Sequence, residues 1–237
     1  GGVREVLATE MLEALGVHTS KPFAWFETGE ELVRGDEPSP TRSSVLTRLS
    51  HGHIRIGTFQ RFAFFEQPEN ITRLVRYCLE HLYCEPPDAG PHRLFDLVAQ
   101  ATADLAASYM AAGFVHGVLN SDNIAISAES FDYGPWRFTP EWDPGFTAAY
   151  FDYHGLYSFG RQAEAIHWDL AQFAGCLTLV TAAPPLSDAL GQWTKRFEEA
   201  LVAALLKRLG VARREPGVDR SLAATLIAAL QSRAAPI

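Results

Sequence analysis

The feature that most constrains the fold is a break in helical periodicity after Gly113. A regular apolar helix pattern runs from about Arg93 to Ala112, and helical patterns rich in Ala and Leu resume after Arg161. Between them, residues 114–138 hold short β-prone pieces separated by polar turns. The chain is therefore expected to be α+β and mainly α, with an irregular polar segment held between long helices.

The other expected elements follow from spacing and from turn residues. Residues 3–15 predict a helix that ends near Gly16, and the β-prone segments 22–28 and 44–49 predict a hairpin whose polar tip, 29–42, is long and mobile. Further helices are predicted at 71–82, 163–181, 187–209 and 219–232, with Pro184–Pro185 and Pro216–Gly217 as separators. Apolar helix faces predict core positions for Cys78, Cys176, Trp168, Leu170, Phe173 and Leu177.

Composition excludes several classes of protein. The chain has 237 residues, 47% hydrophobic and 20% charged, which is enough for one or two globular domains. A net charge of −8 gives no indication of a broad basic surface that would bind nucleic acid or an anionic membrane. The apolar runs fall short of the ~20 residues that a helix needs to cross a bilayer. Three irregularly spaced cysteines predict a reducing compartment, the cytoplasm, or the mitochondrion in a eukaryote. The spacing of His51, His53, His154 and His167 matches no zinc pattern and favours turn or surface positions.

The most specific motif runs from His116 to Asn123, His-Gly-Val-Leu-Asn-Ser-Asp-Asn, and is followed by Asp132-Tyr-Gly. In ordinary protein kinases the corresponding region has the sequence HRDxxxxN followed by DFG, in which an Asn and an Asp hold magnesium against nucleotide phosphates. Here Val118 stands where the catalytic Asp of that pattern should be, and a carboxylate occurs instead at Asp122. This displacement disfavours conventional phosphate transfer.

Asn123 and Asp132 offer the hard oxygen ligands that a divalent cation prefers when it bridges phosphate oxygens. Gly134 would allow a sharp backbone turn after Asp132. An alternative remains open, because Asn-Ser-Asp-Asn is also ordinary turn chemistry, in which side chains bond to nearby backbone amides.

Three segments carry a resemblance to a known family: residues 113–123, Phe131-Asp-Tyr-Gly-Pro135 and Trp142-Asp-Pro-Gly145. They resemble the SelO family, atypical kinase-fold enzymes widely classed as pseudokinases. Further matches are Arg4-Glu5, Arg48 and Arg55 within residues 47–58, and Tyr157-Ser-Phe-Gly160. The resemblance covers roughly residues 3–180.

The resemblance implies a kinase-like fold and a Mg²⁺- or Mn²⁺-dependent transfer of AMP from ATP to Ser, Thr or Tyr hydroxyls of protein substrates. It implies that Asn123 and Asp132 are metal ligands, that Asp132 also binds the nucleotide, and that Asp122 is the base that accepts the hydroxyl proton. Arg48 and Arg55 match arginines that contact the phosphates, a role suited to their planar forks. Without the resemblance, either arginine could be read as a solvated strand residue.

Glu5 matches a nucleotide-site glutamate that pairs with a lysine in the family, and this chain holds no matching lysine or glycine-rich loop. Glu5 is therefore predicted to be unpaired, or to be a first-turn glutamate favoured by the helix dipole. We expect residues 1–60 to be a partial N-lobe, with one helix and about two strands, and 61–237 to be a helical C-lobe with catalytic loop 114–135. The chain is expected to be a fragment of an AMP-transferring enzyme. The alternative is a non-catalytic remnant that binds nucleotide or a partner.

Overall fold

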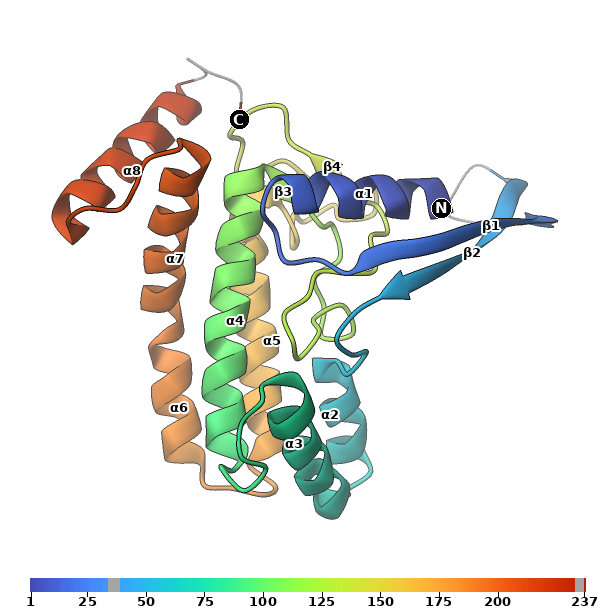
Figure 1. Ribbon diagram of the computed structural model, residues 1–237, viewed down its shortest axis with the longest axis vertical. Coiled ribbons are helices and arrows are strands. Elements are labelled where there is room, and N and C mark those ends of the chain that lie inside the picture. Colours follow the sequence, from blue (N-terminus) through green and yellow to red (C-terminus); the bar gives the residue numbers. More distant parts are fainter. Residues whose placement is uncertain (34–38, 233–236) are drawn as a thin grey trace.

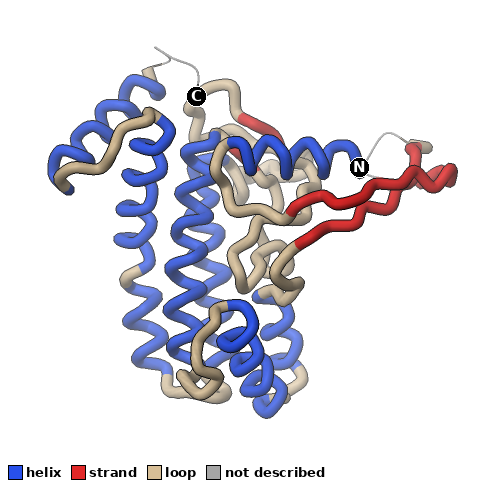
Figure 2. Tube along the Cα trace, viewed as in Figure 1, coloured by secondary structure: helices blue, strands red, loops and turns tan. Residues whose placement is uncertain are grey.

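The computed structural model describes residues 1–33, 39–232 and 237. These residues form a mainly helical α+β structure with two small two-stranded sheets (Figure 2). The elements follow in the order α1 to α8, with a hairpin after α1 and a second, very short sheet after α4. Over the described residues, no helix combines the length and the apolar character needed to cross a membrane.

The central helix is α4 (Pro91–Ala112), which is predicted from its periodicity and confirmed. Pro91 occupies the first helical position, where a missing N–H costs nothing, and Gly113 ends the helix in a left-handed conformation with φ of +67°. Figure 1 shows α4 between α5 (Gln162–Leu177) and the pair α6 (Ala183–Gly191) and α7 (Trp193–Arg208). The core therefore surrounds the helix that leads directly into the polar segment.

Aromatic contacts fasten α2 (Ile56–Phe64) and α4 to α5. The ring of Phe173 contacts Phe59 edge-on, with 4.8 Å between the ring centroids, and its centroid lies 5.7 Å from that of Phe95. All three side chains are fully buried. Such pairs add to the free energy of burying apolar surface. This cluster fixes α2 against the helical body, and α2 begins directly after Arg55.

The N-terminal part consists of α1 (Gly2–Ala14) and an antiparallel hairpin of β1 (Lys21–Leu32) and β2 (Thr41–Leu49). The hairpin runs alongside α1, and its far end projects away from helices α2 to α8 (Figure 1). Its strands are longer than predicted, so less of 29–42 is loop, and residues 34–38 of the predicted mobile tip lie outside the described residues.

Most of the predicted helices are confirmed, including α3 (Pro68–Leu82) and α8 (Pro216–Gln231), and Cys78 and Cys176 are buried. Three predictions were wrong or incomplete. The single helix predicted at 187–209 is two helices, and Pro184 and Pro185 lie in the first turn of α6, where proline is tolerated. The nine-residue α2 was not predicted. Trp168 is 59% exposed, whereas Leu170, Phe173 and Leu177 of the same predicted face are buried.

Candidate nucleotide and magnesium site

Both ends of loop 114–135 are anchored by buried hydrogen bonds. Strands β3 (Phe114–Val115) and β4 (Arg137–Phe138) pair across its base. The Gln162 amide, at the start of α5, accepts from His116 N–H at 3.0 Å and donates to the Phe114 carbonyl at 2.8 Å. His116 Nε2 in turn donates to the Phe131 carbonyl at 3.0 Å, and burial lowers the pKa of this histidine. A neutral imidazole thus joins the start of the loop to the residue before Asp132.

The turn 120–123 forms the side-chain-to-backbone hydrogen bonds expected of its sequence. Asn120 supplies the turn chemistry, because its Oδ1 accepts from Asp122 N–H at 3.0 Å and its carbonyl accepts from Asn123 N–H at 2.8 Å. Asn123 Nδ2 donates to the Val118 carbonyl at 2.8 Å. The amide oxygen of Asn123 is therefore the atom that could serve a metal.

Asp122 lies beside Arg55, 67 positions away in the chain. Arg55 Nη1 donates to the Asp122 carbonyl at 3.2 Å and lies 3.8 Å from Asp122 Oδ1, while the Asp122 side chain stays 66% exposed. Backbone pairing holds the two segments together, with Gly57 N–H donating to Ser121 O at 2.8 Å and Ile56 N–H to Ile124 O at 3.0 Å. Arg55 is accordingly the residue before α2, and not a solvated strand arginine.

Gly57 lets the Asp122 carboxylate lie directly against the backbone at the start of α2. A Cβ at position 57 would lie 2.2 Å from Asp122 Oδ1 and 3.5 Å from Asp122 Cα. The backbone of α2 therefore sets where the Asp122 carboxylate can lie.

Asp132 is exposed and adopts a left-handed backbone conformation with φ of +61°. A residue with a Cβ rarely holds this conformation unless its surroundings impose it, and such residues concentrate at functional sites. Gly134 N–H donates to the Asp132 carbonyl at 3.1 Å, which closes the turn after Asp132.

Glu5 is paired, contrary to one prediction from the sequence. It lies in the first turn of α1, and its Oε2 is 2.5 Å from Nη2 of Arg48 on β2. Burial raises the pKa of Glu5, and the nearby Asp132 charge adds to this, although Arg48 and a backbone hydrogen bond from Tyr133 act in the opposite direction. Glu5 and Arg48 therefore lie close to the Asp132 turn.

The structure thus places the predicted residues in two groups: Asp122 lies with Arg55 and precedes Asn123, and Asp132 lies near Glu5 and Arg48. The donor set at the loop, a carboxylate and an amide oxygen, fits a hard divalent cation such as Mg²⁺. Of the two predicted phosphate-binding arginines, Arg55 donates a hydrogen bond to the loop at Asp122, and Arg48 donates one to the Glu5 carboxylate.

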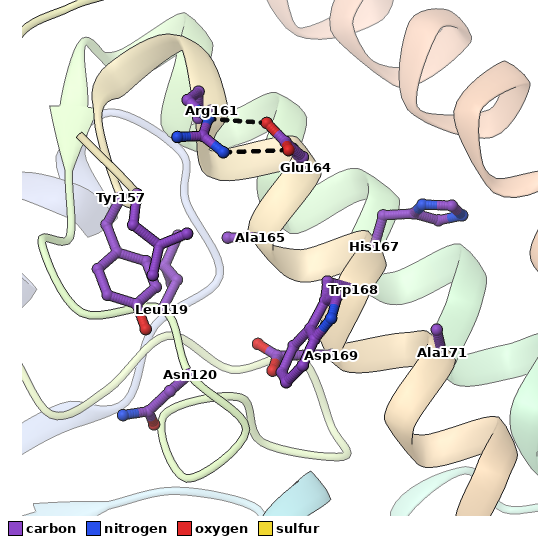
Figure 3. A pocket seen from close by; sticks show the side chains of 11 residues that line it. Leu119, Asn120, Tyr157, Arg161, Glu164, Ala165, His167, Trp168, Asp169 and Ala171 are labelled. Carbon is purple, nitrogen blue, oxygen red and sulfur yellow. Dashed lines mark hydrogen bonds and ion pairs between the residues drawn. The ribbon is translucent and has the colours of Figure 1, made fainter. Parts of the chain in front are cut away.

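Asp169, on α5, is a buried acid that the sequence prediction missed. Both of its oxygens lack a hydrogen-bond partner among the described residues, and burial raises its pKa to about 7. Figure 3 shows Asp169 and Trp168 facing Asn120 and Tyr157 around a pocket of about 490 Å³. The available signal was an Asp between Ile166 and Leu170 on an otherwise apolar helix face.

Comparison with known proteins matches residues 1–236 to the family of the protein adenylyltransferase SelO. Among curated proteins, the chain is 47% identical to the protein nucleotidyltransferase YdiU of Gloeobacter violaceus, over 89% of this chain and 44% of that protein. It is 44% identical to YdiU of Synechocystis sp., over 89% of this chain and 45% of that protein. It is 37% identical to YdiU of Cereibacter sphaeroides, over 97% of this chain and 49% of that protein.

These matches place the chain in a family of protein nucleotidyltransferases. The chain belongs to the SelO family. It spans about half the length of the curated relatives that it matches.

Proposed function

We propose that this chain supplies the metal-binding wall of a site that transfers AMP from ATP to a Ser, Thr or Tyr hydroxyl of a protein. The observation that carries the proposal is the placement of the Asp122 carboxylate, exposed beside Arg55 on the same loop as Asn123 and Asp132. In this proposal, residues 1–60 are the partial N-lobe of a kinase-like fold, and 61–237 are its helical C-lobe.

Asn123 Oδ1 and the Asp132 carboxylate would hold Mg²⁺, or Mn²⁺ in its place. The metal, when bound, offsets negative charge on the phosphates. Asp122 is exposed to an incoming protein side chain and would accept the hydroxyl proton as the oxygen bonds to the α-phosphorus. The bond from that phosphorus to the bridging oxygen breaks, and pyrophosphate leaves.

Arg55 positions Asp122 through its contact with the carbonyl and carboxylate of that residue, and in this proposal its guanidinium also binds a phosphate. Arg48 is held by Glu5. We propose that phosphate oxygens compete with Glu5 for the Arg48 guanidinium, so that nucleotide binding weakens the Glu5–Arg48 pair.

A second candidate function is nucleotide binding without chemistry. It is favoured by the Glu5–Arg48 pair, because Glu5 engages one of the two arginines proposed to orient the phosphates for transfer, while nucleotide could still bind through the proposed metal ligands and Arg55. The two candidates differ in whether the α-phosphate label of ATP becomes covalently attached to protein.

The test uses ATP labelled separately on the α and γ phosphates, incubated with this chain and with a longer form that spans the length of its relatives. Transfer of the α label to protein, lost in Asp122→Asn, is the expected result. Asp188→Asn, an exposed acid on α6, is the matched control and should behave as wild type. Transfer from the γ position alone would refute AMP transfer, and nucleotide binding without covalent label would favour the second candidate.

A further inference from the structure

Two histidines and a glutamate from three separate segments meet close to the Asp132 turn, with both histidines exposed and the glutamate buried. His18 follows α1, His51 follows β2, and Glu129 precedes Asp132 by three residues. Their ligand atoms all lie within 4.8 Å of one another. The sequence spacing did not indicate this group, because its members are separated by 33 and 78 positions.

Backbone pairing that does not involve these side chains holds two of the segments in place. Ser130 N–H donates to the His18 carbonyl at 2.9 Å, Ser20 N–H donates to the Ser130 carbonyl at 3.1 Å, and Thr19 and Ser130 form a parallel bridge. The positions of His18 and Glu129 are therefore fixed by the fold.

Glu129 is a buried carboxylate whose two oxygens have different surroundings. Its Oε2 accepts from His51 N–H at 2.9 Å and from the Ser127 hydroxyl at 3.3 Å. Its Oε1 lies 3.0 Å from His51 Nδ1 and 3.9 Å from His18 Nε2. One oxygen is thus fixed by the protein, while the other faces two imidazole nitrogens.

We propose that His18 Nε2, His51 Nδ1 and Glu129 Oε1 form a binding site for Zn²⁺. The ligand atoms of a tetrahedral zinc ion, with bonds of ~2.0–2.1 Å, lie about 3.4 Å apart. Glu129 Oε1 lies 3.0 Å from one imidazole nitrogen and 3.9 Å from the other, and all three ligand atoms are within 4.8 Å of one another. Both histidines are exposed, so their rings can rotate and a water molecule can take the fourth position. Two nitrogen donors favour zinc over magnesium, which separates this site from the oxygen donors of Asn123 and Asp132.

The zinc ion would connect the turn after α1, the end of the hairpin and the loop that carries Asp132. These segments hold Glu5, Arg48 and Asp132 at the proposed nucleotide site. The ion would therefore act as a structural clip that fixes the N-terminal part against loop 114–135. This inference does not depend on AMP transfer.

Zinc affinity tests the site directly. The full 237-residue chain, freed of metal and carrying Cys84→Ser to remove an exposed thiol, is titrated with Zn²⁺ against a chromophoric chelator. One equivalent should bind, and His18→Ala and His51→Ala should each weaken binding by about tenfold or more. His53→Ala is the matched control, because His53 packs on the Phe131 ring outside the group and its loss should leave affinity unchanged.

Two further variants make the outcome decisive. Asp132→Ala should keep full zinc affinity, and equal losses in Asp132→Ala and His51→Ala would place the ion at the Asp132 carboxylate and overturn the proposal. Thermal unfolding gives a second readout. Zinc should raise the Tm of the parent chain but not of His18→Ala, in which only an exposed side chain is removed. Binding that is absent, or that is unaffected by both histidine substitutions, would contradict the site.

Discussion

Glu5 Oε2 lies 2.5 Å from Arg48 Nη2. This ion pair joins the first turn of α1 to the C-terminal end of β2. Both side chains are mostly buried, with 18% and 22% of their surface exposed. The pKa of Glu5 is nevertheless raised, which means that desolvation outweighs the attraction of Arg48. The pair therefore holds two charges in a place that water reaches poorly.

Removing Arg48 should destabilise the protein because Glu5 would remain buried without its counter-ion. Arg48→Ala is expected to lower the free energy of unfolding by about 1–3 kcal/mol. The matched control is Arg42→Ala on the same strand, where an exposed pair with Glu27 at 3.1 Å should contribute less than about 0.5 kcal/mol. Urea unfolding of the three proteins measures both changes. Equal effects of the two substitutions would show that the Glu5–Arg48 pair has no special role.

Asp169 predicts an unusual pH dependence of stability. The pKa of Asp169 is about 7 in the folded protein and near the ordinary value of 3.8 in the unfolded chain. Between about pH 4 and pH 7 the carboxyl group is therefore mostly protonated in the folded state and mostly ionised in the unfolded state. The free energy of unfolding therefore falls as the pH rises from about 4 to 7, and this penalty is fully present above pH 7.

Asp169→Asn should remove this penalty while keeping the shape of the side chain. The stability gained by the variant should increase between about pH 5 and pH 8 by on the order of 2 kcal/mol. Denaturant unfolding at several pH values measures the gain, with Asp188→Asn as an exposed control that should show none. A gain that stays constant with pH would mean that Asp169 ionises normally.

Some of these features could be predicted from sequence and some could not. Helices α3 and α4 follow from local periodicity, and the interval from His116 to Asn123 located the loop. Helix α2 has only nine residues, too few for a clear apolar period, and its position depends on Phe59 packing against Phe173. The Glu5–Arg48 pair and the group of His18, His51 and Glu129 join distant segments, and no local pattern specifies which segments meet.

The magnesium assignment predicts a selective loss in Asp132→Ala. Because its carboxylate is one of the two proposed metal ligands, the variant should lose Mg²⁺-dependent ATP binding, measured by calorimetry on a form that spans the length of the relatives. Asp132 is exposed, and alanine keeps a Cβ at this left-handed position, so the free energy of unfolding should fall by no more than about 1 kcal/mol. Unchanged ATP affinity would remove Asp132 from the metal site.

Gly57 offers a way to move Asp122 without replacing it. In Gly57→Ala the new methyl group would displace Asp122 Oδ1, which lies 2.2 Å from the position of the added Cβ. The displaced atom is the end of an exposed side chain, so the free energy of unfolding should change by less than about 1 kcal/mol. If Asp122 accepts the hydroxyl proton, AMP transfer should fall by roughly 10–100-fold, because small misplacements of catalytic groups are costly. Mg²⁺-ATP affinity should be kept, since Asn123 and Asp132 are untouched.

The matched control for this variant is Gly175→Ala on α5, where an added Cβ meets no atom within 4 Å and activity should not change. Initial rates of α-label transfer and calorimetric ATP affinity, measured side by side, separate chemistry from binding. Wild-type rates in Gly57→Ala, with the same ATP affinity, would show that the position of the Asp122 carboxylate does not matter. The proton would then have to be accepted by another group, and the assignment of Asp122 as the base would be wrong.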